Sequence, residues 1–264
     1  MAAANLLLVG IGIVSCVLGS LAGLGGGFLM VPLLVALYHP APRYAAGTVL
    51  VAMVFNSLAS IWGYGRQKRI DYRSGLLFAS AGVPGSIAGA YAAGAMTGPA
   101  FNTLFGIVML IVSLSLLFRP QKLLRLPFRP TVQRRFTDRR GQEFSYEFSG
   151  RFGAAVAFAV GFLSSLLGIG GGSVMVPTMV LFLGFPPHIA GATSMFMILI
   201  SSLVGGGMHA FLGDVMWGRV LWLAPGAFIG GRLGSWMAPR VPGVWMVRIL
   251  GTFMALVAVQ LIVH

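Results

Sequence analysis

The sequence Gly25-Gly26-Gly27-Phe28-Leu29-Met30-Val31-Pro32 interrupts a long apolar region near the start of the chain. It recurs as Gly170-Gly171-Gly172-Ser173-Val174-Met175-Val176-Pro177, in which every residue number is 145 higher. Glycine and proline both disfavour the interior of a helix, although the surrounding hydropathy favours one. In a bilayer, non-helical backbone is tolerated only where protein buries it or where it lines a polar cavity. A binding site is therefore first expected at these two stretches.

The composition is that of a membrane protein. Of the 264 residues, 57% are hydrophobic and 9% are charged, and the charged share is far below the roughly 25% of soluble domains. The formal charge of +13 comes from basic residues between the apolar segments, as the positive-inside rule expects. The sequence predicts a multi-pass protein of the cell (plasma) membrane, in contact with the lipid bilayer and without a nucleic-acid partner.

The apolar segments predict an all-α polytopic membrane protein with about eight transmembrane segments. They form two homologous halves, residues 1–118 and 152–264. Each half opens with a segment, 5–37 or 152–183, that would measure roughly 50 Å as a helix, against a hydrocarbon core of about 30 Å. We expect each to be a broken Gly-rich helix that continues as a half-length helix. Further spans are expected at residues 45–63, 75–95, 101–118, 190–212, 220–236 and 245–263.

Other residues match at the same shift of 145, including Thr48 with Thr193 and Ser57 with Ser202. Matches in the same order along a whole half favour a duplicated unit. The sequence leaves the relative orientation of the halves open. If each broken segment crosses the membrane once, the halves are parallel, whereas a segment that crosses and returns makes them inverted.

Residues 119–151 form the one long polar segment and hold nine of the eighteen basic residues. We place this basic loop in the cytoplasm, together with the basic loop 66–73. Phe144, Tyr146 and Phe148 alternate with polar residues, which favours a small β-hairpin. A disordered linker is the alternative.

Each glycine run precedes a short helix that begins within the predicted membrane region. A helix N-terminus carries unpaired N–H groups and a partial positive charge, and glycine lets an anion approach the backbone closely. Two such N-termini, joined by hydroxyl groups that follow, would bind a small oxyanion between the two halves. The alternative is that the glycines only allow close helix crossing. The candidate binding residues are Gly25, Gly26, Gly27, Thr48, Asn56, Gly170, Gly171, Gly172, Thr193, Ser194, Ser201 and His209.

Ionisable residues are scarce within the predicted spans. His209 is a candidate proton carrier, because an ionisable group inside a membrane is costly and usually functional; a hydrogen-bonded residue near the end of its span is the alternative. Arg232 either contacts an anion or extends to the interface. No Asp or Glu lies in the middle of a predicted span, which disfavours a carboxylate proton relay. We find no catalytic or metal motif, so we expect neither an enzyme nor a cofactor.

The doubled motif resembles the TauE/SafE family, the sulfite exporter or toluene-sulfonate uptake permease group. The resemblance rests on the two glycine runs with their Val-Pro pairs, on Ala192-Thr193-Ser194, and on Pro225-Gly226 with Gly230-Gly231. It covers nearly the whole chain except residues 119–151. The first half departs from the pattern at Gly47-Thr48-Val49. The resemblance implies a plasma-membrane transporter with two related halves that moves sulfite, sulfonates or related small anions.

We therefore expect a secondary transporter, with export as the expected direction, that carries small sulfur-containing oxyanions such as sulfite or organosulfonates. Its expected partners are a small anionic substrate and the bilayer, and a homo-oligomer is left open. The alternative is a membrane scaffold or accessory subunit that binds a partner through the basic cytoplasmic loop. Two matched helix breaks favour the transporter, since an assembly subunit would not need them.

Overall fold

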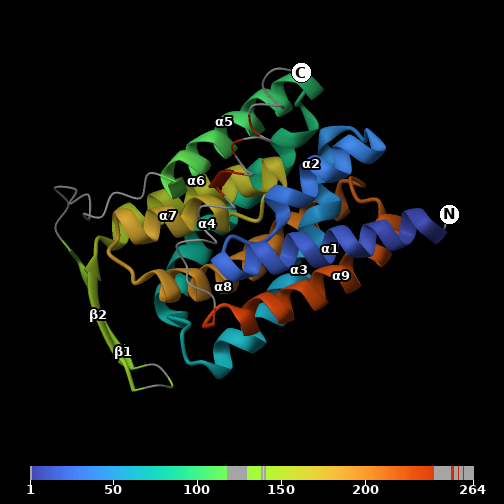
Figure 1. Cartoon of the computed structure of the whole chain (residues 1–264). Coiled ribbons are helices and arrows are strands. Elements are labelled where there is room, and N and C mark those ends of the chain that lie inside the picture. Colours follow the sequence, from blue (N-terminus) through green and yellow to red (C-terminus); the bar gives the residue numbers. More distant parts are fainter. Residues whose placement is uncertain are drawn as a thin grey trace.

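The structure is a computed structural model that describes residues 2–117, 130–137, 139, 141–240, 251, 252, 255 and 258. In this part of the chain it consists of a body of packed helices and a two-stranded hairpin that projects from one end (Figure 1). The helices are α1 (Ala2–Ala22), α2 (Gly27–Tyr38), α3 (Pro42–Arg66), α4 (Tyr72–Gly94), α5 (Gly98–Leu117), α6 (Gly150–Leu167), α7 (Gly172–Leu181), α8 (Pro187–Phe211) and α9 (Trp217–Met237), and the strands are β1 (Val132–Thr137) and β2 (Glu143–Phe148).

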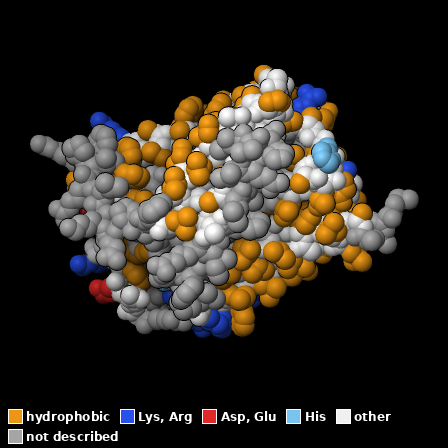
Figure 2. All heavy atoms as spheres, turned by 45° about the horizontal axis from the view of Figure 1, so that its top comes forward, with side chains coloured by type: hydrophobic (Ala, Val, Ile, Leu, Met, Phe, Trp, Pro, Cys, Tyr) orange, Lys and Arg blue, Asp and Glu red, His pale blue; other side chains and the backbone are white. Residues whose placement is uncertain are grey.

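Six of the described helices are long and apolar enough to cross a membrane, namely α1, α3, α4, α5, α6 and α8. Phe211, Leu221 and Leu6 are 81%, 71% and 68% exposed, and hydrophobic side chains spread over the described surface in Figure 2. Such a surface is suited to lipid rather than water. The prediction of a polytopic helical membrane protein is confirmed. The expected span at 245–263 lies mostly outside the described residues.

Both long apolar segments are broken at their glycines, as the sequence predicts. Gly25 has a φ of 97° and Gly170 a φ of 82°, in the left-handed region that glycine adopts without a Cβ penalty. After each break the short helix turns back along the long one. The Tyr38 hydroxyl at the end of α2 donates to the carbonyl of Ala4 in α1, at 3.4 Å. At the second break, the rings of Phe152 near the start of α6 and of Phe182 just after α7 lie 6.5 Å apart. Each broken segment is therefore a hairpin of a long and a short helix.

Glycines allow two pairs of long helices to pack backbone against backbone. Along α4, a Cβ added at Gly85 or Gly89 would overlap a carbonyl oxygen of α6. Along α9, a Cβ at Gly226 would overlap the carbonyl of Val9 in α1. Small residues at four-residue spacing permit this close approach in membrane helices. The first half thus packs against the second through α1 with α9 and α4 with α6.

The hairpin of β1 and β2 is antiparallel, with Arg134 opposite Tyr146. Along β2, Tyr146 and Phe148 are buried, whereas Glu143, Ser145 and Glu147 are exposed. Phe148 packs against Phe78 of α4 and Phe185, with ring centroids 5.5 and 5.1 Å apart. The aromatic residues at every second position of β2 therefore face the helical body, and the polar residues between them face solvent. Of the two alternatives for this loop, the structure has the hairpin.

Asp71, which precedes α4, anchors the hairpin to the body. Its carboxylate accepts hydrogen bonds from the hydroxyl of Tyr146 at 2.7 Å and from the N–H of Ser74 at 3.1 Å. It also lies 3.6 Å from Nε of Arg134. Burial, followed by the bond to Asp71, raises the pKa of Tyr146 well above its ordinary value. At every pH at which the tyrosine of the unfolded chain keeps its proton, the folded Tyr146 hydroxyl therefore keeps it too and can donate to Asp71.

We expect Tyr146→Phe to loosen the hairpin. The variant removes a hydrogen bond to a charged acceptor, a loss of about 1.5–3 kcal/mol. Amide hydrogen exchange in β1 and β2 should accelerate, whereas Ser145→Ala on the exposed face should have no effect.

Because the pKa of Tyr146 is raised, this stabilisation is complete below the unfolded pKa of about 10. Wild-type exchange, corrected for the intrinsic rate, should thus be equally protected at pH 6 and pH 9; unchanged protection in Tyr146→Phe would contradict the anchor.

Candidate functional site

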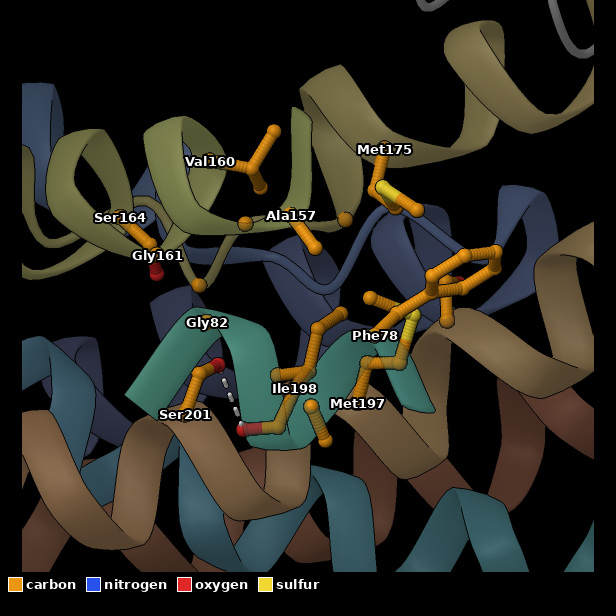
Figure 3. A pocket seen from close by; sticks show the side chains of 15 residues that line it. Phe78, Gly82, Ala157, Val160, Gly161, Ser164, Met175, Met197, Ile198 and Ser201 are labelled. Atoms are coloured by element: carbon orange, nitrogen blue, oxygen red, sulfur yellow. Dashed lines mark hydrogen bonds between the residues drawn. The ribbon is translucent and has the colours of Figure 1, made fainter. Parts of the chain in front are cut away.

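A small cavity of about 20 Å³ lies beside the second helix break (Figure 3). Four helices and the break surround it, and no charged side chain is among the described residues that line it. Its polar lining comes from the break, from α6 and from α8. These residues are Gly170, Gly171, Gly172, Ser164, Ser194 and Ser201.

The N-terminus of α7 opens onto this cavity, because Gly172 is both its first residue and part of the lining. Gly171 precedes the helix with a φ of 75°. Within the described residues, the N–H groups of Ser173 and Val174 have no hydrogen-bond partner. Such first-turn N–H groups, together with the helix dipole, favour an anion. The cavity therefore offers backbone donors without a formal charge.

Three serines differ in how far their hydroxyls are engaged. Ser201 donates to the carbonyl of Ile198 in its own helix, at 3.2 Å, and Ser194 bonds the carbonyls of Gly23 and Gly191. Ser164 is buried, and its hydroxyl has no partner in the described part of the chain. Buried polar groups without a partner are uncommon in folded proteins. Ser164 is thus the side chain with free hydrogen-bonding capacity in this cavity, and sequence reasoning did not single it out.

The cavity has a polar and an apolar end. In Figure 3, Ser164 and Ser201 lie toward one end, and Phe78, Met175 and Met197 lie toward the other. Thioether and aromatic side chains present polarizable apolar surface. A ligand with an anionic group and a short apolar part would match this arrangement.

In the first half, the position that matches Ser201 carries a side chain with hydrogen-bond partners on other segments. Asn56 occupies the position 145 residues before Ser201. Its Oδ1 accepts from the hydroxyl of Ser20 at 2.8 Å, and its Nδ2 donates to the carbonyl of Gly25 at 3.4 Å. Ser60 donates in turn to Ser20 at 2.9 Å. Asn56 is therefore engaged in a buried network and does not line the cavity.

The two breaks meet each other inside the body. A Cβ added at Gly27 would lie 2.8 Å from the carbonyl oxygen of Ile169, and one at Gly172 would lie 2.8 Å from that of Gly23. A Cβ at Gly26 would lie 2.8 Å from the carbonyl oxygen of Ser15 in α1. In the first run, Gly26 and Gly27 thus pack against backbone, and Gly25 faces the side chains of Met53 and Ile198. The glycines of the second run line the cavity.

Thr48 and Thr193 do not line the cavity and instead bond the residues that precede two other helices. Oγ1 of Thr48 accepts from the N–H of Met216 before α9, and Oγ1 of Thr193 accepts from the N–H of Asp71 before α4, each at 3.0 Å. Both bonds join one half of the chain to the other. The donors, like the threonines, are 145 residues apart.

His209 is buried outside the cavity lining. Its Nε2 lies 2.9 Å from the carbonyl oxygen of Ser165, so Nε2 carries a proton and donates. Its Nδ1 lies 3.7 Å from the carboxylate of Asp214. At the equivalent position 145 residues earlier, Tyr64 donates to the carbonyl of Ser20. These contacts agree with the second of the two roles considered for His209, a hydrogen-bonded residue near the end of its span.

Arg232 does not reach the cavity either. Its guanidinium lies over the ring of Trp62, with the Cζ atom 4.4 Å from the ring centroid, and Trp62 is 51% exposed. A cation stacked on an exposed tryptophan is typical of the membrane interface. Of the two alternatives for Arg232, extension to the interface describes this geometry.

Comparison with known proteins gives a consistent set of relatives. The family described as "Sulfite exporter TauE/SafE" matches residues 8–261. The "Probable membrane transporter protein YunE" of Bacillus subtilis is 39% identical, over 97% of this chain and 96% of that protein. A "Probable membrane transporter protein" of Xylella fastidiosa (strain Temecula1) is 27% identical over 95% and 92%, and MJ0441 of Methanocaldococcus jannaschii is 28% identical over 78% and 72%. No solved structure matches significantly.

Proposed function

Because the chain belongs to the sulfite exporter TauE/SafE family, we propose that it is a secondary transporter of small sulfur-containing oxyanions, with export as its direction. The observation that carries this proposal is the N-terminus of α7 at a cavity whose described lining residues include no charged side chain. Backbone donors and the hydroxyl of Ser164 would bind the oxyanion. An anion held by dipoles rather than by a lysine or arginine can also leave, which transport requires.

Within this class, we propose organosulfonates as preferred substrates over sulfite. The support is the apolar end of the cavity with Phe78, Met175 and Met197. The sulfonate group would lie against the break and Ser164, and the organic group against the thioether and aromatic side chains. Sulfite has no organic group and would leave the apolar end without contacts.

The cavity must expand to bind such a substrate. A volume of about 20 Å³ exceeds the ~10–15 Å³ that one water molecule requires, but a sulfonate has at least five heavy atoms. Under this proposal, the structure would be a closed form of the transporter. We propose that the helices around the break separate during transport, in alternation between the two sides of the membrane.

We further propose that the two halves are inverted repeats. The support is that α2 returns to the side on which α1 begins. Together with the span that the sequence predicts at 245–263, this return would give each half an odd number of crossings. The paired bonds of Thr48 and Thr193 are related by the same shift of 145 residues. Inverted repeats are a common basis for alternating access around a central site.

Cysteine labelling tests which side of the membrane each end of the described helices faces. The turn at Gly213 lies at the start of α3, where Asp214 pairs with Arg43 at 3.3 Å, and the hairpin lies at the other end of α3. In a Cys16→Ala background, Gly213→Cys should react with an impermeant reagent in intact cells. Arg135→Cys on β1 should react only after permeabilisation, since the basic end faces the cytoplasm. The reverse pattern would overturn the orientation.

Transport by purified protein in liposomes tests the function, with taurine, sulfoacetate, sulfite, sulfate and a carboxylate compared. Ser201→Asn introduces the residue that occupies the equivalent position in the first half, so we expect at least a tenfold loss of sulfonate flux in a folded protein. Ser201→Ala removes a hydroxyl bonded to its own helix and should change flux less than threefold. Wild-type protein that moves none of the sulfur anions, or normal flux by Ser201→Asn, would reject the proposal.

A further inference from the structure

A second and larger cavity, of about 630 Å³, lies between β1 of the hairpin and the loop that joins α3 to α4. It shares no lining residue with the cavity beside α7. Its volume is within the range of about 300–1,000 Å³ that is typical of ligand pockets. The residues that line it are Gly65, Lys68, Ile70, Asp71, Tyr72, Arg73, Gln133, Arg134, Arg135 and Thr137.

Positive charge dominates this hairpin cleft. Four basic residues line it, against the single carboxylate of Asp71. That carboxylate is already engaged with Ser74, Tyr146 and Arg134. In the described ranges, no carboxylate lies within ion-pair distance of Lys68, Arg73 or Arg135. Three cations therefore share one cavity without a counter-ion from the described part of the protein.

Contacts at both ends fix the walls of the cleft. At one end, Asp71 bonds the body to Tyr146 of the hairpin. At the other, the N–H of Arg139 donates to the carbonyl of Gln67 at 3.3 Å. Between them, Lys68 has a φ of 51°, a left-handed conformation that costs a non-glycine residue roughly 1–2 kcal/mol. Such a residue at the wall of a cavity is often functional.

We propose that the hairpin cleft binds a phosphate-bearing anion. A phosphate group presents several oxygens and up to two negative charges, so it can engage more than one guanidinium and an ammonium at once. The cleft lies where the helices end, and Tyr72 in its wall is half exposed, as aromatic residues at the membrane interface are. The phosphate belongs either to the headgroup of an anionic phospholipid, which basic pockets on the cytoplasmic side bind, or to a soluble compound, since guanidinium groups recognise phosphate from either source.

The test compares two triple variants that remove the same charge from the same end of the molecule. Lys68→Gln/Arg73→Gln/Arg135→Gln neutralises the cleft and leaves Asp71 and Arg134, which hold the hairpin. Arg66→Gln/Arg151→Gln/Arg240→Gln is the control, because none of the three lines the cleft. Binding of pyrophosphate to purified protein is measured by calorimetry at 150 mM salt. Retention of phosphatidylglycerol, relative to phosphatidylcholine, is measured by native mass spectrometry.

We expect the cleft triple to weaken binding of at least one probe tenfold or more, and the control triple to weaken it less than threefold. Pyrophosphate binding by delipidated protein identifies a soluble ligand. Selective retention of phosphatidylglycerol that pyrophosphate does not displace identifies the headgroup. If the cleft triple fails to fold, Arg135→Glu on the exposed strand face serves instead and should also weaken binding tenfold. Equal effects of cleft and control variants, or no binding of either probe by wild type, would overturn the proposal.

Discussion

Replacing Gly171 by alanine is expected to reduce sulfonate transport at least tenfold while the protein remains folded. The added Cβ would lie 3.2 Å from Cγ1 of Val160 and 3.4 Å from the side chain of Ser164. Both residues line the cavity beside α7, so the methyl group takes space from a cavity that holds about one water molecule. Side chains can adjust to such a contact, and the fold survives. Flux in liposomes and elution of the purified protein measure the two effects separately.

The matched control for backbone strain is Gly213→Ala. Gly213 has a φ of 78°, close to the 75° of Gly171, and nothing lies within 4 Å of the Cβ position. Both variants therefore carry a similar conformational cost, roughly 1–2 kcal/mol, but only one occupies the cavity. We expect Gly213→Ala to transport normally. Normal flux by Gly171→Ala at normal expression, or equal losses in both variants, would remove Gly171 from the binding site.

Gly26 is expected to respond differently. The Cβ of Gly26→Val would lie 2.8 Å from the carbonyl oxygen of Ser15 and 3.1 Å from Cα of Cys16. These are backbone atoms of α1, which cannot rotate away as a side chain can. The loss in this variant should therefore be a loss of folded protein, which is the close-packing interpretation of the first glycine run.

The second large effect concerns helix packing. Gly85→Ala should prevent the accumulation of folded protein, because the Cβ would overlap the carbonyl oxygen of Phe158 and approach the N–H of Phe162 at 3.0 Å. To accept it, α4 and α6 must separate along their contact, at a cost of about 3 kcal/mol or more. The yield of monodisperse protein and its thermal midpoint in detergent report this loss.

Gly94 provides the control on the same helix. Nothing lies within 4 Å of its Cβ position, and alanine is favoured over glycine in a helix by about 1 kcal/mol. Gly94→Ala should therefore fold as well as wild type or slightly better. If Gly85→Ala accumulates to the same level with the same thermal midpoint, the backbone contact between α4 and α6 is wrong.

Local chemistry made much of this fold predictable. Hydropathy and the shortage of charge indicate membrane helices, and glycines at Gly25 and Gly170 indicate the breaks, since only glycine adopts their φ values freely. The alternation of Phe144, Tyr146 and Phe148 indicates the hairpin. In each case a residue and its neighbours in the sequence are enough to predict the local structure, because the signal is a preferred backbone conformation or a regular spacing of apolar residues.

The predicted site divides into parts that the sequence could not separate. Gly171 and Gly26 belong to nearly identical motifs, yet one borders the cavity and the other packs against α1. The difference lies in residues from other helices: Asn56 in the first half is bonded to Ser20, whereas Ser201, 145 residues later, lines the cavity. The sequence of a motif does not show which side chains from other helices pack against it, so it cannot predict whether a cavity remains there.

The amino-acid sequence alone is enough to identify a polytopic membrane protein of the TauE/SafE family with two broken helices. Composition and helix-breaking residues act locally, so they can be read without a fold. Three features required the packed helices: α2 turns back along α1, Thr48 and Thr193 accept hydrogen bonds from the starts of distant helices, and Ser164 has no hydroxyl partner among the described residues. These depend on which helices come into contact, and hydrogen-bond partners far apart in the chain leave no pattern in the sequence around either residue.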